Sequence, residues 1–180
     1  MFRSKLLSSI ITIGLLVAGM QSTIAAEKQI LGVNEAVYLA DFELQLDAKM
    51  DTGATTSSLS ATDIETFEKD DDPWVRFKLA IEDGPEDTYE FPVVRSSRIK
   101  RRAGDLTSKH KKTYSKRPVI ELEVVIGKKT EKIEVNLTDR STFKYPFLVG
   151  AKALTKLKFI IDPSEEFLAG EPNHDKESDD

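Results

Sequence analysis

A single acidic tripeptide, Asp51-Thr52-Gly53, is the part of this chain whose residue types best suit chemistry. The alternating apolar residues Ala48 and Met50 precede it and predict that Asp51 lies at the end of a strand. Gly53 permits a tight turn, and the small residue Ala54 leaves room for a substrate and for a second loop. A carboxylate exposed on such a turn can act as a base on a water molecule. An Asp that only caps a turn is the alternative, and the tripeptide alone does not decide between them.

A second motif later in the chain supplies a partner for this loop. Tyr145-Pro146-Phe147-Leu148-Val149-Gly150 is an apolar run closed by glycine, and a short helical stretch is expected at residues 151–157. Two further segments lie between the loop and this run, namely Arg117-Pro118-Val119-Ile120 and Leu137-Thr138-Asp139-Arg140. Taken in this order with the loop at residues 49–59, the four motifs resemble a bacterial family of retropepsin-like aspartic peptidases, long labelled ATP-dependent zinc proteases. The resemblance covers residues 29–163.

This resemblance implies an aspartic endopeptidase that hydrolyses peptide bonds with an activated water. In such enzymes two carboxylates share one proton and hold the water between them. The chain has one Asp-Thr-Gly, so Asp51 must meet Asp51 of a second copy, and a homodimer is predicted. By analogy with the family, Thr52 locks the two loops together, Gly53 brings backbone N–H groups near the carboxylates, and Ala54 lines the substrate groove.

Two other functions remain open at this stage. One keeps the fold and removes the chemistry, leaving a catalytically silent peptide-binding or adaptor module. The other is a monomeric β-barrel of the cell envelope that binds a small molecule and carries the Asp-Thr-Gly by coincidence.

Two features depart from the family pattern. Ala151 stands where many relatives have an Arg, so an ion pair near the dimer interface is missing. The separation between Asp51 and Gly150 is also longer than in the compact retroviral enzymes. We expect the extra length in the Lys/Arg-rich region, where retropepsins carry the flap that covers the substrate.

Lysine and arginine concentrate in that region, because ten of the 26 in the chain lie between Arg95 and Arg117. Cations there would steer and hold peptides rich in Asp or Glu, and family members are linked to processing of glutamate-rich peptide tails. The candidate substrate-binding residues are Arg98, Lys100, Arg101, Arg117 and Arg140. For the basic stretch the alternative is a solvated, mobile loop. For Arg140 a surface position at a strand end is slightly favoured.

Nucleic acid is not expected as a partner. Tyr114 is the only aromatic residue in the basic stretch, and the formal net charge of the chain is −5. A metal or other cofactor is not expected either. The chain has no Cys and only two His, His110 in the basic stretch and His174 near the end, and this does not suit a zinc site. No Gly-rich, Lys-containing phosphate loop supports ATP binding.

The N-terminal segment, residues 1–26, predicts a signal peptide. Arg3 and Lys5 precede an apolar stretch at 6–20, and small residues follow at 23–26. The apolar stretch is shorter than the roughly 20 residues that span a membrane, so we expect export without a stable span. An uncleaved anchor is the alternative. For a Gram-negative source the location is periplasmic or secreted.

The remaining chain predicts one domain at residues 27–163 and an acidic, disordered tail at 164–180. Apolar alternation predicts short strands at 36–39, 42–50, 74–81, 88–94, 119–126, 132–137 and 157–161. The polar segment 61–69 is expected to hold a turn of helix. Many short strands with one short C-terminal helix predict an all-β fold, a small closed barrel of the retropepsin-like (acid protease) type.

Overall fold

The computed structural model describes residues 28–100 and 114–173 of the chain. Its strands are β1 (Gln29–Leu31), β2 (Asn34–Leu39), β3 (Leu44–Asp51), β4 (Ser57–Lys69), β5 (Asp72–Leu79), β6 (Thr88–Pro92), β7 (Arg95–Lys100), β8 (Tyr114–Ile126), β9 (Lys129–Thr138), β10 (Phe147–Gly150) and β11 (Phe159–Ile161). A 3₁₀ turn, η1 (Ala40–Phe42), and a short helix, α1 (Ala151–Lys156), complete the order of elements. The predicted all-β fold with one short C-terminal helix is confirmed.

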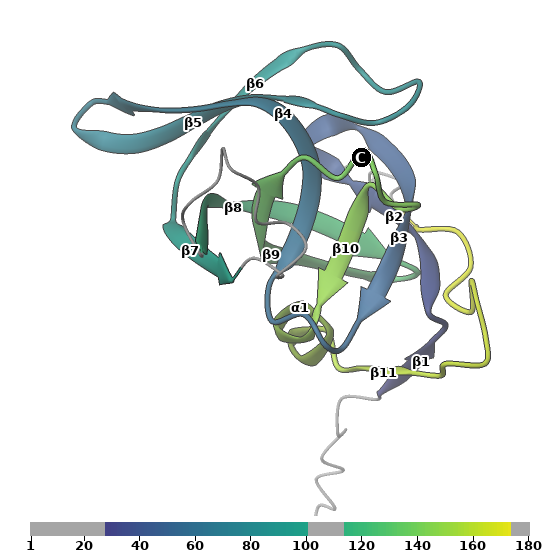
Figure 1. Cartoon of the computed structure of the whole chain (residues 1–180). Coiled ribbons are helices and arrows are strands. Elements are labelled where there is room, and N and C mark those ends of the chain that lie inside the picture. Colours follow the sequence, from purple (N-terminus) through teal and green to yellow (C-terminus); the bar gives the residue numbers. More distant parts are fainter. Residues whose placement is uncertain (1–27, 101–113, 174–180) are drawn as a thin grey trace, which may run out of the picture.

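Most of the strands form a closed ring (Figure 1). From β10 the hydrogen-bonded path runs through β3, β2, β8 and β9 to β4, and β4 pairs back to β10. In the parallel β10–β3 pair Gly150 lies beside Asp51, and in the antiparallel β10–β4 pair Leu148 lies beside Ser58. Because β10 fits between β3 and β4, two motifs that are far apart in the sequence become neighbours.

Alternation along the strands explains the interior of the ring. On β3 the side chains of Leu46, Ala48 and Met50 are buried, and the polar residues between them face solvent. The same alternation buries Val75, Phe77 and Leu79 on β5, as the sequence pattern predicts. Burial of each larger side chain among these contributes about 1.5–3 kcal/mol, which stabilises the ring and the strand β3 that leads into the Asp51 loop.

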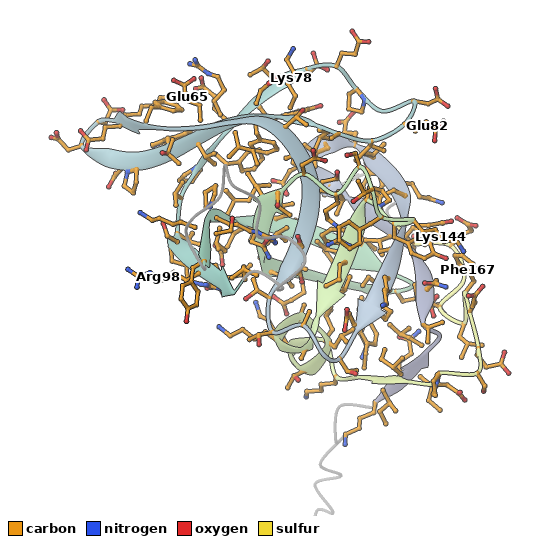
Figure 2. The ribbon with its side chains drawn as sticks, viewed as in Figure 1. Glu65, Lys78, Glu82, Arg98, Lys144 and Phe167 are labelled. Carbon is orange, nitrogen blue, oxygen red and sulfur yellow. The ribbon has the colours of Figure 1, made fainter. Side chains whose placement is uncertain are left out.

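The outer half of β4, together with β5 and β6, forms an arm outside the ring (Figure 1). Its inner face packs aromatic rings on Phe42 of η1, with centroid distances of 6.3 Å to Phe77, 4.8 Å to Tyr89 and 5.6 Å to Phe91. Charged residues such as Glu65 and Lys78 lie on the solvent side of the arm (Figure 2).

The turn of helix predicted at residues 61–69 is wrong, because this segment is the outer half of β4. The register of the β4–β5 pair shifts between Thr62 and Glu65, and Asp63 has a φ of 51°. Such a bulge bends a strand and increases its twist, so one long strand can leave the ring and continue into the arm. The segment is polar because it is exposed. Its residue pattern alone does not indicate that it pairs with β5.

The acidic tail is ordered farther than its composition predicts. Val33 donates its N–H to Glu165 O at 2.8 Å, and Phe167 donates to Asn34 O at 2.8 Å. The fully buried Glu35 carboxylate accepts the N–H groups of Leu168 and Ala169 at 3.1 and 3.0 Å. The predicted disorder is therefore wrong for residues 164–173, because bonds to the Glu35 carboxylate and to the backbone of Val33 and Asn34 hold this segment. Residues 174–180 and the predicted signal peptide lie outside the described residues.

The last strand, β11, pairs in parallel with β1 as a small separate sheet. Within the described ranges no helix is both long enough and apolar enough to cross a membrane.

Candidate active site

Asp51 is the last residue of β3, at the point where the chain enters the loop formed by residues 52–56, which we call the catalytic loop after the role that the family resemblance predicts for it. Its Oδ1 accepts the backbone N–H of Gly53 at 2.9 Å. The Nζ atom of Lys49 lies 3.9 Å from Oδ2, and 27% of the Asp51 side chain is exposed. The carboxylate is therefore held by its own loop and stays accessible to a solute.

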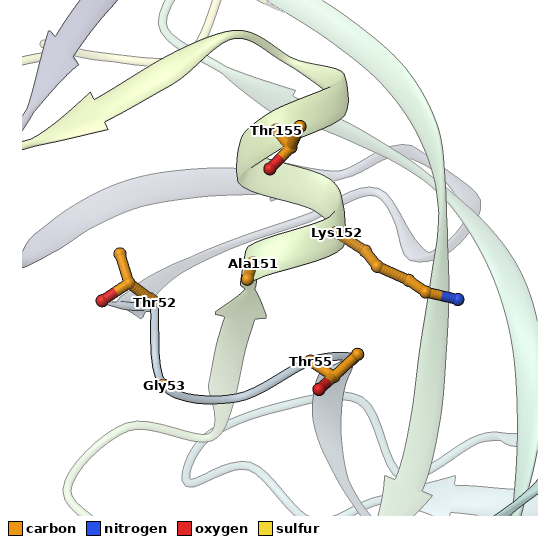
Figure 3. Close-up of a pocket in the computed structure, with 6 residues that line it drawn as sticks. All are labelled: Thr52, Gly53, Thr55, Ala151, Lys152 and Thr155. Atoms are coloured by element: carbon orange, nitrogen blue, oxygen red, sulfur yellow. The ribbon is translucent and has the colours of Figure 1, made fainter.

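The start of α1 holds this loop from one side. The backbone N–H of Ala151 donates to Ala54 O at 2.7 Å, and that of Lys152 donates to Thr55 O at 3.2 Å. Figure 3 shows the loop bending at Gly53 close to the first turn of the helix. These bonds satisfy loop carbonyl groups and fix the path of the backbone that follows Asp51.

Gly150 makes the closest approach to the loop. Its N–H donates to Ser57 Oγ at 3.1 Å. A Cβ atom at this position would lie 2.7 Å from the carbonyl carbon of Thr56 and 2.9 Å from Ala54 O. These are backbone atoms that cannot rotate away. The close approach of the loop therefore requires a glycine at position 150, because any larger residue would collide with it.

A hollow of about 360 Å³ opens between the loop and the helix. It is lined by Thr52, Gly53, Thr55, Ala151, Lys152 and Thr155. In Figure 3 Thr52 and Thr55 lie on the two sides of the bend, and Ala151 faces the loop with its methyl group. The departure from the family pattern at Ala151 therefore lies in the wall of this hollow.

A second cavity, of about 440 Å³, lies between the catalytic loop and the β7–β8 strand pair; we call it the basic groove. Its lining includes Ala54, Ser58, Asn136 and Leu148. The cations in its wall are Arg95, Arg98, Arg117, Arg140 and Lys152, and no carboxylate is among its described lining residues. An anionic peptide would meet a complementary charge here.

Arg140 is buried in this wall, with 8% of the residue exposed, so the surface position that was slightly favoured is wrong. Its guanidinium stacks on the ring of Phe143 at 4.5 Å. Burial lowers the pKa of Arg140, repulsion from Arg117 lowers it further, and attraction to Asp51 opposes both effects. The fold therefore brings two of the predicted cations into one electrostatic environment with the predicted catalytic acid.

The other predicted cations have different outcomes. Arg98 and Arg117 line the basic groove, and Figure 2 shows Arg98 on β7 toward the outside of the molecule. Lys100 is the last residue of β7, and Arg101 lies outside the described residues. The parts of the basic stretch that the structure describes are paired strands, from Arg95 beside Val119 to Lys100 beside Tyr114, and not a solvated loop.

The predicted set of site residues omitted Asn136. It is 2% exposed and sits on β9, where it accepts bonds from Ser58 Oγ at 3.2 Å and from Arg117 Nη1 at 3.1 Å. Its own amide donates to Ser57 O at 2.6 Å. An Asn in the apolar alternation of a predicted strand was the signal available in the sequence. Arg95 and Glu134 were also missed.

Groups of carboxylate and imidazole ligands that could hold a metal ion are absent from the described ranges 28–100 and 114–173. What the site itself offers is the accessible carboxylate of Asp51 on a hydrogen-bonded loop beside a cationic groove. Such a carboxylate can exchange a proton with a water molecule, and the groove can hold an anionic chain next to it.

Comparison with known proteins places this geometry in context. The family model RimB-like, described as retropepsin-like aspartic endopeptidase RimB, matches residues 30–172. A probable alpha-L-glutamate ligase of Shewanella halifaxensis is 32% identical over 131 residues, which is 71% of this chain and 27% of the relative. A protein of the same name from Desulfotalea psychrophila is 29% identical over 148 residues, 80% of this chain and 30% of the relative. The chain thus spans less than a third of these curated relatives.

A solved structure has a similar fold. It is that of a Legionella pneumophila protein of unknown function, 33% identical in sequence, with a TM-score of 0.64. The match covers 79% of this chain and 99% of that chain.

Proposed function

Because this chain belongs to the RimB-like family of retropepsin-like aspartic endopeptidases, we propose that it hydrolyses peptide bonds as an exported homodimer. Asp51 of each copy would face the other across a two-fold axis, and the two carboxylates would share one proton. The ionised carboxylate takes a proton from the water as the water attacks the scissile carbonyl. The protonated one donates to the carbonyl oxygen, which carries the developing charge.

The observation that carries this proposal is the position of Asp51. It ends a buried strand, remains 27% exposed, and lies beside Gly150 in the register of β3 and β10. A carboxylate that only capped a turn would not need the adjacent loop to be fixed by a second motif. The bonds from Gly150, Ala151 and Lys152 hold that loop and so support a role that depends on geometry.

The second copy is required by the chemistry, because one chain supplies one Asp-Thr-Gly. The hollow beside Thr52 and Gly53 supports this part of the proposal. It leaves space next to the loop, and Thr52 of each copy would bond to the opposite loop there. The predicted signal peptide at residues 1–26 supports export, and from a Gram-negative source the dimer would lie in the periplasm or outside the cell.

The substrates we propose are acidic peptides. The basic groove has Arg98, Arg117 and Arg140 in its wall next to the catalytic loop, and these cations would bind carboxylates through charge-assisted hydrogen bonds. The curated relatives are named probable alpha-L-glutamate ligases, and a protein joined to glutamate carries the matching charge. This agreement between groove and relatives supports the choice of substrate.

A catalytically silent peptide-binding module is the second candidate. The observation that favours it is the groove itself, because its cations can hold an acidic chain without any reaction at Asp51.

One experiment separates the two functions. Purified residues 27–180 and the Asp51→Asn variant are incubated with a mixed peptide library from about pH 4 to 8, and new termini are read by mass spectrometry. Sedimentation analysis in the same buffers reports the oligomeric state. Cleavage by the wild type and not by the variant supports the peptidase. Absence of cleavage by a folded dimer that still binds acidic peptides would support the silent module.

A further inference from the structure

Arg95, the first residue of β7, contacts the catalytic loop through its side chain. Its Nη2 donates to Thr56 Oγ1 at 3.1 Å. The same nitrogen donates to Glu134 Oε2 at 2.6 Å, and Nε donates to that oxygen at 2.9 Å. A single guanidinium therefore connects β7, β9 and the loop that follows Asp51.

Among the described residues, the other bonds to the loop involve its backbone and the neighbouring side chains of Asp51 and Ser57. Ala151 and Lys152 donate N–H groups to its carbonyl oxygens, and Gly150 donates to Ser57 Oγ. Thr56 lies between these points, and its side chain is fixed by Arg95. Without this bond the loop would keep its contacts with β10 and α1, and Ser57 would keep its bond to Asn136 of β9, but the Thr56 side chain would lose the hydrogen bond that fixes it.

Glu134 fixes Arg95 in turn. Its carboxylate also lies 3.6 Å from Lys152 Nζ, so it sits between two cations of the groove wall. The hydrogen bond from Arg95 lowers the pKa of Glu134, and that same bond raises the pKa of Arg95. Both groups consequently remain ionised at neutral pH, and the guanidinium has one strongly favoured orientation.

Arg95 differs in this respect from its neighbour on the same strand. The Arg98 side chain lines the basic groove, and no hydrogen bond or ion pair joins it to the other described residues. Two nitrogens of Arg95 are already used by Glu134 and Thr56. The guanidinium therefore orders the protein rather than waiting for a ligand.

We infer that Arg95 is a positioning residue of the peptidase, which holds the catalytic loop at Thr56 and is itself oriented by Glu134. This inference rests on the proposed activity at Asp51. A small displacement of a loop that carries a reacting group lowers the rate of the chemical step, even when substrate still binds.

The test compares three variants with two reference variants in purified residues 27–180. Arg95→Lys keeps the positive charge but ends in a single nitrogen, so it loses the paired Nε and Nη2 bonds to Glu134 that orient the contact with Thr56. Thr56→Val removes the hydroxyl and keeps the shape, and Glu134→Ala removes the support of Arg95. Arg98→Lys reports a change in a substrate cation. Glu131→Gln is the matched control, because its carboxylate pairs with Lys156 at 2.8 Å on the same strand and helix, away from the basic groove.

Steady-state kinetics are measured on an acidic peptide and on a neutral peptide of equal length. We expect Arg95→Lys, Thr56→Val and Glu134→Ala to lower kcat by about 10- to 100-fold on both peptides, with KM little changed. Glu131→Gln retains the wild-type kcat. If Arg95→Lys and Glu134→Ala instead raise KM for the acidic peptide only, as Arg98→Lys does, then Arg95 is a substrate cation and the inference is overturned.

Hydrogen exchange supplies a measurement that does not need activity. We expect amides of residues 52–58 to exchange about fivefold faster in Arg95→Lys and Thr56→Val than in the wild type. Glu131→Gln should not change them. If the wild type fails to cleave any peptide, the proposed function fails. Faster exchange in the two variants would still support the inference that Arg95 holds the loop at Thr56. Unchanged exchange in both variants would overturn it, whatever the activity.

Discussion

Gly150 donates its backbone N–H to the hydroxyl of Ser57 across 3.1 Å, and this bond joins residues 93 positions apart in the sequence. The same glycine lies beside Asp51 in the parallel pair of β10 and β3. Its lack of a side chain allows the backbone of the catalytic loop to approach within contact distance. The conformation of the loop therefore depends on the strand that fits between β3 and β4.

Gly150→Ala is expected to destabilise the protein and to displace the loop. The added methyl group would meet the backbone of Ala54 and Thr56, and overpacking of this kind costs about 1–3 kcal/mol. Urea unfolding measures the change in the free energy of unfolding, and kcat reports the loop. Ser57→Ala is the companion variant, because it removes the acceptor of the Gly150 N–H without steric conflict. If the Gly150→Ala protein has wild-type stability and kcat, then position 150 does not need to be glycine for the loop to approach.

Arg140→Met and Arg117→Met are expected to weaken the binding of acidic peptides specifically. Each removes a cation from the wall of the basic groove, and a hydrogen bond to a charged group contributes about 1.5–3 kcal/mol. We expect KM for an acidic peptide to rise by about tenfold or more, with little change for a neutral peptide of the same length. Equal losses on both peptides would show that these arginines support the fold and not substrate choice.

Glu134 is expected to make the stability depend on pH in the acid range. Its pKa is lowered in the folded protein, chiefly by the hydrogen bond from Arg95. A carboxyl group with a depressed folded pKa stabilises the fold above its unfolded pKa, which is about 4.3 for Glu. That contribution is lost as the pH falls through the lower, folded value. The wild type should therefore melt above Glu134→Gln at neutral pH.

Thermal unfolding of both proteins from about pH 3 to 7 measures this difference. The two Tm values should converge at the acid end of the series. A difference in Tm that stays constant over the whole range would show that the charge of Glu134 is not the cause.

Glu35→Ala is expected to free the C-terminal segment. The buried carboxylate accepts the N–H groups of Gly32 at 2.5 Å, Leu168 at 3.1 Å and Ala169 at 3.0 Å. Leaving buried donors unsatisfied costs about 1–3 kcal/mol each, so we expect a loss of about 2–4 kcal/mol after partial rehydration. Limited proteolysis followed by mass spectrometry should then detect cleavage within residues 164–173.

Glu171→Ala is the control for that segment. It removes an exposed side-chain bond of 2.6 Å to Gln45 and should change stability by less than about 0.5 kcal/mol. If both variants resist proteolysis as the wild type does, Glu35 does not organise the tail.

Much of the barrel was predictable, because its strands are half-buried and each carries its own signal. The alternation of Leu46, Ala48 and Met50 shows in the sequence which face of β3 is inside. The outer half of β4 was not predictable in this way. Both of its faces beyond the bulge are largely exposed, so its residues are polar and only the pairing with β5 makes it a strand.

The prediction of a disordered tail was wrong for residues 164–173 for a related reason. Composition averages over a segment, whereas the order of residues 164–173 rests on bonds to Glu35 and to the backbone of Val33 and Asn34. A buried carboxylate with three donors is not distinguishable in sequence from an acid on the surface.

By itself the sequence determined the type of fold, the acid on which a reaction would depend and the glycine that accompanies it. Asp51 and Gly150 belong to short motifs, and each motif can be recognised in the sequence from its own residue types. Only the tertiary structure decided that Arg140 interacts with both Arg117 and Asp51, because Arg117 lies on β8, Arg140 follows the end of β9 and Asp51 ends β3. The hydrogen bonds that join Arg95 to Glu134 and Thr56 likewise form only because the fold brings these three residues together. Motifs of adjacent residues can be identified from the sequence, whereas charged residues that are distant in the sequence become neighbours only when the chain folds.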